Sequence, residues 1–184
     1  MELTTGRPAD AAGREEKEMA AYDFLDGLGI SYVRVDHEAA MSMAACAEID
    51  KSLGTTICKN LFLCNRQKTK YYLLMMPGNK PFRTSAASSQ VGSSRLSFAP
   101  PEVMERCIHT LPGSASVLGL MHDTENEVQL VIDREVLMGE YVGCHPLVNT
   151  TSLRIRTEDF KNIILPALRH TPIVIDLPRE EEAQ

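Results

Sequence analysis

The strongest constraint on the fold is an apolar segment, residues 57–63, that carries a lysine. In an extended strand alternate side chains face opposite sides, so Lys59 shares one face with Ile57 and Leu61. A buried ammonium without a partner is too costly to stay charged. Lys59 therefore either extends to solvent past its packed stem or lines a cavity, where it would bind a phosphate or a carboxylate.

The length and composition are those of one globular domain. The chain has 184 residues, of which 43% are hydrophobic and 24% charged. It contains no apolar run near the ~20 residues that cross a bilayer, and residues 1–7 lack the apolar core of a signal peptide. We expect a flexible segment at residues 1–13, a single domain at 14–177, an acidic tail at 178–184, and a cytoplasmic location.

Cysteines and histidines give no sign of a metal or disulfide framework. The five cysteines are odd in number and show no paired spacing, and the five histidines share no ligand spacing. We expect reduced thiols, no metal and no cofactor.

The charge pattern limits how the chain could bind nucleic acid. The net charge of −6 argues against coating DNA or RNA by general electrostatics. Basic residues nevertheless gather in the middle of the chain, among them Lys51, Lys59, Lys68, Lys70, Lys80, Arg83 and Arg95. A small local site for the end of a nucleic-acid strand remains compatible with this pattern.

Hydrophobic periodicity and turn residues predict intermixed helices and strands without regular βαβ units. Helices are predicted over residues 14–28, 84–91, 101–107 and 157–168, with a further short one that ends near 53. Strands are predicted over residues 30–35, 57–64, 71–76, 96–98, 128–132, 153–155 and 172–175. This pattern favours an α+β fold with a largely antiparallel, curved sheet.

Two segments of the second half contain residues suited to ester chemistry. The small residues at 113–116 would let backbone N–H groups approach an oxyanion, although an ordinary tight turn has the same composition. His145 precedes Pro146 and is biased to an extended backbone, where Cys144 would face the opposite side. A Cys–His nucleophile is therefore disfavoured, and a purely structural histidine remains an alternative.

Several characteristic segments follow one another along this chain in a fixed order. After the lysine strand come residues 94–99, 112–120, 127–133 and 143–151. The ordered set resembles the YbaK-type aminoacyl-tRNA deacylases, and within them the free-standing prolyl-tRNA editing proteins. The resemblance runs from about residue 20 to 175 and implies a mixed, barrel-like sheet flanked by helices. One departure is Val117, which stands where the family has proline in a Gly-x-x-x-Pro loop.

The resemblance also implies roles for individual residues. Those placed around the terminal adenosine and its ester are Lys59, Asn60, Arg95, Gly113, Ser114, Ala115, Ser116, His145 and Asn149. Lys59, Gly113 and His145 would be catalytic, and Lys59 with Arg95 would hold the terminal phosphate. Met41 and Met43 match positions that shape the aminoacyl pocket, although plain core packing is their alternative role.

The implied activity is hydrolysis of mischarged Ala-tRNA(Pro) by a trans-editing deacylase. A synthetase pocket shaped for proline rejects smaller alanine weakly, since a missing methylene is worth only ~1–3 kcal/mol, and a second sieve corrects the error. The implied partners are mischarged tRNA and, as a candidate, prolyl-tRNA synthetase, with neither DNA nor a membrane involved. Two alternatives stay open: removal of cysteine or serine from a tRNA, and non-catalytic binding of aminoacyl-tRNA ends, which the Val117 departure favours.

Overall fold

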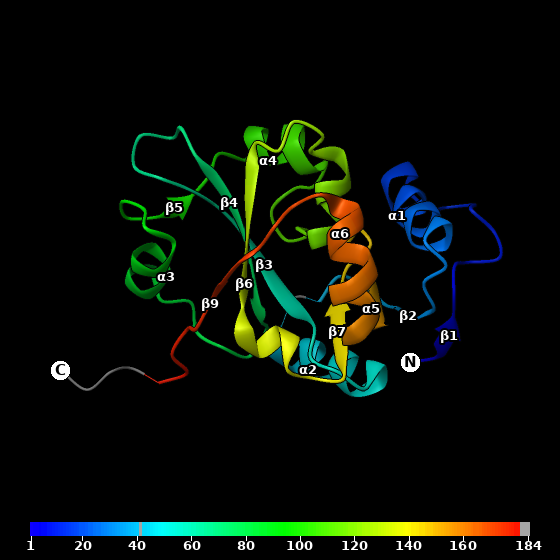
Figure 1. Ribbon diagram of the computed structural model, residues 1–184. Helices are drawn as coiled ribbons and strands as arrows, with labels where there is room; N and C mark the ends of the chain where they lie inside the picture. Colours follow the sequence, from blue (N-terminus) through cyan, green and yellow to red (C-terminus); the bar gives the residue numbers. More distant parts are fainter. Residues whose placement is uncertain (41, 181–184) are drawn as a thin grey trace.

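The computed structural model describes residues 1–40 and 42–180, which form two β-sheets with helices packed around them (Figure 1). The first sheet is antiparallel throughout and has the strand order β1-β2-β8-β7. Its strands are β1 (Leu3–Thr5), β2 (Tyr32–Asp36), β8 (Thr151–Arg156) and β7 (Tyr141–Cys144).

The second sheet is mixed and has the order β5-β3-β4-β6-β9. Its strands are β5 (Ser97–Phe98), β3 (Cys58–Cys64), β4 (Tyr71–Pro77), β6 (Val128–Asp133) and β9 (Ile173–Ile175). The antiparallel pair β3 and β4 confirms the predicted hairpin, whereas β6 and β9 add in parallel. Both faces of these strands are covered by other parts of the protein, which is why their sequences are nearly continuous apolar runs.

The α+β class is confirmed, but the sheet does not close into a barrel. The two sheets meet at an isolated bridge between Ile57, just before β3, and Gly143 of β7. A Cβ at Gly143 would lie 2.9 Å from the carbonyl oxygen of Thr56, so the backbones approach as closely as only glycine allows. The expected single barrel-like sheet is in fact two sheets, joined among the described residues by this one β-bridge.

Helix α2 (Met43–Leu53) begins and ends where the sequence provides caps. Ser42 accepts a hydrogen bond from the Ala45 amide at the start of α2, and Gly54 ends that helix at φ +77°. The α-helices are α1 (Glu16–Gly27), α2 (Met43–Leu53), α3 (Thr84–Val91), α4 (Pro101–Ile108), α5 (Thr157–Asp159) and α6 (Leu165–Leu168). Two 3₁₀-helices, η1 (Val117–His122) and η2 (Arg134–Leu137), and a π-helix, η3 (Phe160–Ile164), complete the described helices.

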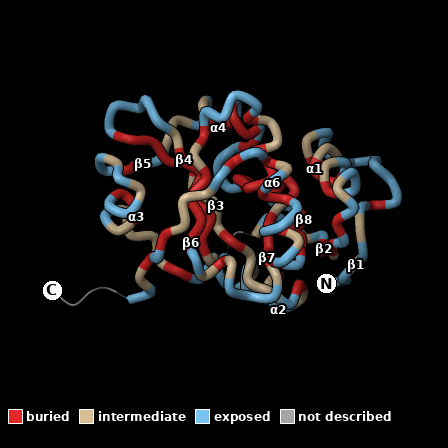
Figure 2. The backbone as a smooth tube through the Cα atoms, in the orientation of Figure 1, coloured by how far each residue is buried: buried red, intermediate tan, exposed pale blue. Residues whose placement is uncertain are grey.

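Buried residues follow β4 and β6 through the middle of the molecule (Figure 2). Two hydrophobic clusters cover the two faces of the second sheet. The larger contains Phe62 and Leu73 and extends to α1 and the first sheet, while the smaller contains Leu63 and Leu74 and packs against α3. Adjacent residues of β3 and β4 thus enter different clusters, as the two-residue period requires.

The N-terminal segment contains a strand that the sequence did not indicate. Leu3–Thr5 pairs with β2, although residues 1–13 were expected to be flexible, because backbone pairing fixes a short polar strand that carries no periodicity of its own. At the other end, Arg179 bonds Glu135, and the rest of the acidic tail, 181–184, lies outside the described residues. None of the helices in the described part of the chain has the length and apolar character needed to span a membrane.

Candidate active site

A cavity of about 560 Å³ opens where β3, α2 and the segment after β7 come together. Its walls are formed by His37, Ala40, Cys46, Ile49, Asp50, Ile57, Cys58, Lys59, Asn60, Leu61, Gly78, Gly113, Ala115, His145 and Asn149. The volume lies in the usual range for small-molecule sites.

The cavity follows the outer edge of β3. Among the described strands, β5 pairs with this edge only at Leu63 and Cys64, and β7 meets it only at Ile57. Residues 59–61 are left without a neighbouring strand on that side, so side chains from both faces of β3 reach the opening.

Lys59 lines this cavity and is half-buried. Burial lowers the pKa of its ammonium below the ordinary 10.5, because the charged form loses hydration. Its Nζ forms no salt bridge with any carboxylate among residues 1–40 and 42–180. The lysine is therefore a cation at a cavity wall that has no protein counter-ion within the described chain.

Asn60 leaves an acceptor free in the same cavity. Its Nδ2 donates weakly to the Cys58 carbonyl at 3.5 Å, while its Oδ1 is buried and has no partner among the described residues. A buried acceptor without a donor costs about 1–3 kcal/mol. A ligand donor, such as a ribose hydroxyl or a base amine, would remove that cost.

The ring of His145 is oriented by a backbone hydrogen bond. Its Nδ1 lies 2.9 Å from the carbonyl oxygen of Thr151, which only accepts, so Nδ1 carries the proton and Nε2 keeps its lone pair in the neutral ring. Burial lowers the pKa of His145 below the ordinary 6.5, and nearby His37 acts in the same direction. His145 is thus a neutral acceptor at physiological pH.

Thr151 is itself held by ionic groups. Its hydroxyl lies 3.0 Å from a carboxylate oxygen of Asp36, which Arg14 also binds at 2.9 Å. Arg14 further contacts Glu18 at 2.9 Å. These bonds link α1 and β2 to the carbonyl that fixes the His145 ring.

The glycine loop has two amides without an acceptor among the described residues. Gly113 has φ +93°, a conformation that favours glycine. The Ser114 amide is already used, because it donates to the Leu111 carbonyl at 3.0 Å. The amides of Gly113 and Ala115 have no acceptor among the described residues, and both residues line the cavity.

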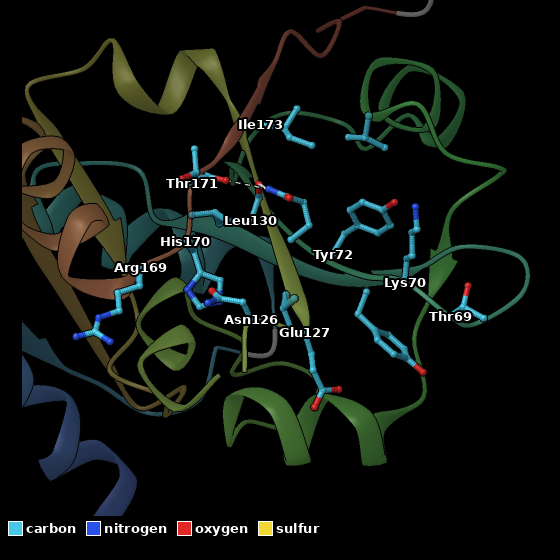
Figure 3. Close-up of a pocket in the computed structure, with 14 residues that line it drawn as sticks. Thr69, Lys70, Tyr72, Asn126, Glu127, Leu130, Arg169, His170, Thr171 and Ile173 are labelled. Atoms are coloured by element: carbon cyan, nitrogen blue, oxygen red, sulfur yellow. Dashed lines mark hydrogen bonds between the residues drawn. The ribbon is translucent and has the colours of Figure 1, made fainter. Parts of the chain in front are cut away.

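A second hollow, of about 480 Å³, lies where β4 and β6 begin (Figure 3). Several of its polar side chains are bonded to the protein: Gln129 donates to the Thr171 carbonyl at 2.9 Å, and Glu127 pairs with Arg106 at 2.8 Å. His170 bonds Asp123 at 2.8 Å. The cavity at Lys59 holds the buried Asn60 Oδ1, which has no partner among the described residues, whereas no buried side-chain polar atom of the second hollow is left so; the cavity at Lys59 is therefore the better candidate site.

Comparison with known proteins agrees with this choice. The model of the aminoacyl-tRNA editing domain matches residues 37–163, which include every residue that lines the cavity. The chain belongs to the aminoacyl-tRNA editing domain family.

Two relatives and one solved structure are similar to this chain over most of its length. The prolyl-tRNA editing protein ProX of Acetoanaerobium sticklandii is 26% identical over 140 residues, 76% of this chain and 85% of that protein. Prolyl-tRNA synthetase associated domain-containing protein 1 of Mus musculus is 29% identical over 156 residues, 83% of this chain and 91% of that protein. A crystal structure of a protein proposed as a trans-editing enzyme for prolyl tRNA synthetase has a TM-score of 0.66 at 17% identity, covering 89% of this chain and 99% of its own.

In this editing domain, six of the expected site residues line the cavity. They are Lys59, Asn60, Gly113, Ala115, His145 and Asn149. Ser114 and Ser116 lie just behind it: Ser114 Oγ donates to the Leu111 carbonyl, and Ser116 Oγ donates to the His145 carbonyl. Their hydroxyls therefore hold the loop rather than face the cavity.

Two of the expected residues lie elsewhere. Arg95 is exposed and precedes β5, which pairs with the end of β3 away from Lys59, so the two cations do not share a phosphate site as expected. Met43 is 89% exposed at the start of α2 and does not line the cavity. Met41 lies outside the described residues. Val117, the departure from the family loop, is fully buried in the core.

Sequence reasoning missed the α2 wall, formed by Cys46, Ile49 and Asp50. Asp50 accepts from the Ile57 amide at 3.0 Å, and burial raises the pKa of its carboxyl. It forms no salt bridge with a described cation. One signal was available, since a carboxylate in the last turn of a helix opposes the helix dipole and calls for another explanation.

Proposed function

We propose that this protein is a trans-editing deacylase that hydrolyses Ala-tRNA(Pro) to free alanine and tRNA. The observation that carries the proposal is the charge arrangement of the cavity. Lys59 is the one lysine or arginine among the described lining residues, and Asp50 the one acid. Neither has an ionic partner there, and an aminoacylated adenosine end brings one of each sign: a phosphate and an α-ammonium.

The remaining polar groups suit attack of water on the ester. Water adds to the carbonyl carbon, and the amides of Gly113 and Ala115 stabilise the oxyanion that forms. The ester C–O bond then breaks, and the ribose oxygen takes up the proton that the attacking water gives up. His145 Nε2 accepts a hydrogen bond from the water or from the neighbouring ribose hydroxyl, which orients it.

A deacylation panel tests the proposal. Purified protein is mixed with tRNA(Pro) carrying alanine, serine, cysteine or proline, and release of each amino acid is followed. We expect alanine to leave fastest and proline to survive, because an overfilled site costs ~1–3 kcal/mol or more. Fast removal of cysteine or serine instead would reassign the substrate. Binding without release from any of the four would identify a non-catalytic binder. Because proline tRNA is the proposed substrate, prolyl-tRNA synthetase is the proposed source of the mischarged product.

Asp50→Asn should reduce recognition of the free α-ammonium. We expect KM for Ala-tRNA(Pro) to rise about tenfold, since a hydrogen bond to a charged group is worth ~1.5–3 kcal/mol. N-acetyl-Ala-tRNA(Pro), which lacks the cation, should be a poor substrate for the unmodified protein. The unmodified protein and Asp50→Asn should hydrolyse it at similar rates. Equal losses for both substrates would contradict an ammonium contact.

The pH profile should show two limbs set by the cavity. Activity should fall on the acid side as His145 gains a proton and loses its acceptor, at a pH below the ordinary 6.5. It should fall on the alkaline side as Lys59 loses its charge, below the ordinary 10.5. The measurement is kcat/KM against pH after subtraction of spontaneous hydrolysis. In His145→Asn the acid limb due to His145 should vanish, whereas the titration of the substrate's own amine should stay. An acid limb unchanged in this variant would show that His145 does not cause it.

Cys144→Ala should keep most of the activity. Cys144 is fully buried in the core, and burial raises the pKa of its thiol far above the usual range, so a thiolate does not form. Burial also raises the pKa of the Cys58 thiol to about 12. The assay is single-turnover deacylation beside circular dichroism. A folded but inactive Cys144→Ala variant would support nucleophilic catalysis by the thiol instead.

A further inference from the structure

A strip of exposed basic and aromatic side chains continues from the cavity along β3. The β3–β4 turn presents Arg66, Lys68 and Lys70, all exposed. The Arg66 amide donates to Ser94 Oγ at 3.1 Å, which places the Arg95 loop beside this turn. In Figure 1 the turn and β5 lie on the side of the molecule opposite α1. We call Arg66, Lys68, Lys70 and Arg95 the basic tip.

The basic tip is charged and ordered. None of its four cations forms a salt bridge with a described carboxylate, in a chain whose net charge is −6. The turn is held by the Asn65 side chain, whose Oδ1 accepts from the amides of Thr69 at 2.9 Å and Lys70 at 3.1 Å. Figure 3 shows Lys70 beside Thr69 at the end of this turn. Uncompensated cations on a fixed turn fit a polyanion.

Phe98 lies between the basic tip and the cavity. It is 68% exposed on β5 and pairs with Leu63, so it stands on the same face of the sheet as Lys59 and Leu61. Lys59 and Leu63 are four residues apart, roughly 13 Å along the strand. Phe98 packs on one side against Phe82, with ring centroids 6.4 Å apart. An exposed aromatic ring between a cavity and a group of cations is the pattern of a single-strand binding surface.

We propose that this strip binds the tRNA just upstream of its terminal adenosine. Phe98 stacks on a base of the single-stranded 3′ end, and the basic tip contacts phosphates where the acceptor stem begins. The inference rests on the proposed function, because the cavity must hold the terminal adenosine. The inference also gives Arg95 a role in tRNA binding. Arg95 lies too far from Lys59 to hold the terminal phosphate together with it.

The test uses two variants with the same change of charge. Arg66→Ser/Lys70→Ser removes two cations from the basic tip, and Arg156→Ser/Lys161→Ser removes two exposed cations at the end of β8 and in η3. Each is assayed with Ala-tRNA(Pro) and with alanyl-adenosine, and its Kd for uncharged tRNA(Pro) is measured at several salt concentrations.

For the basic-tip variant we expect KM and Kd for tRNA to rise about tenfold, with turnover of alanyl-adenosine unchanged. The slope of log K against log salt should become shallower by about 1.4–1.8, the value for two lost phosphate contacts. Phe98→Ser should weaken tRNA binding about tenfold, and Phe98→Tyr should restore it.

The inference would be overturned if the two double variants weakened tRNA binding equally. It would also be overturned if the basic-tip variant lost as much activity on alanyl-adenosine as on Ala-tRNA(Pro). Absence of hydrolysis of both substrates by the unmodified protein would instead overturn the proposed function. The tRNA-binding measurement still decides the role of the basic tip in that case.

Discussion

Lys59→Met should lower kcat/KM for Ala-tRNA(Pro) by roughly 10- to 150-fold while the protein stays folded. Methionine keeps most of the apolar stem and removes the cation that faces the cavity without a counter-ion among the described residues. A hydrogen bond to a charged group contributes ~1.5–3 kcal/mol, which sets the range. Stability should not fall, because burial disfavours the charge that is removed.

Lys51→Met is the matched control. Lys51 is exposed in the last turn of α2, the helix that forms one wall, but it does not line the cavity. Its loss should change kcat/KM less than twofold. Equal losses in both variants would assign the effect to general electrostatics. Activity of Lys59→Met within threefold of the unmodified protein would remove Lys59 from the site.

Gly143→Ala should destabilise the protein and abolish most activity. The new Cβ would lie 2.9 Å from the Thr56 carbonyl oxygen and 3.0 Å from Ile57 Cα, both backbone atoms that cannot turn aside. Overpacking of this kind costs about 1–3 kcal/mol, or roughly 2–12 °C in Tm for a chain of this size. The shift would separate β7 from β3, and with them His145 from Lys59.

Gly139→Ala provides the comparison. Its Cβ would meet only the Tyr141 carbonyl oxygen at 3.6 Å, an ordinary contact. Thermal unfolding and deacylation of this variant should match the unmodified protein. If Gly143→Ala also unfolds at the unmodified temperature, the contact between the two sheets is looser than the structure places it.

Local rules predicted most of the elements. The alternation at residues 57–63 predicted β3, and Gly54 and Pro101 marked helix boundaries that the structure has. Such features depend on a few neighbouring residues, so they can be read from the chain. The short strand β7 was missed because Tyr141–Cys144 becomes extended only by pairing with β8.

The cavity was predicted in part, through the landmarks that resemble the editing family. Lys59, Gly113 and His145 were expected there and do line it. Asp50 was not expected, because nothing local in α2 shows that its carboxylate meets the amide of Ile57, seven residues later. That contact depends on how the helix packs against the start of β3.

The sequence by itself determined the strand that carries a lysine, the helix boundaries at Gly54 and Pro101, and the residue types of an ester-binding loop. The tertiary structure decided which of those residues meet. Antiparallel pairing of β5 with the far end of β3 carries Arg95 away from Lys59, and the bridge at Gly143 brings His145 toward it. Register between strands is set by packing across the whole fold, and no local sequence pattern contains it.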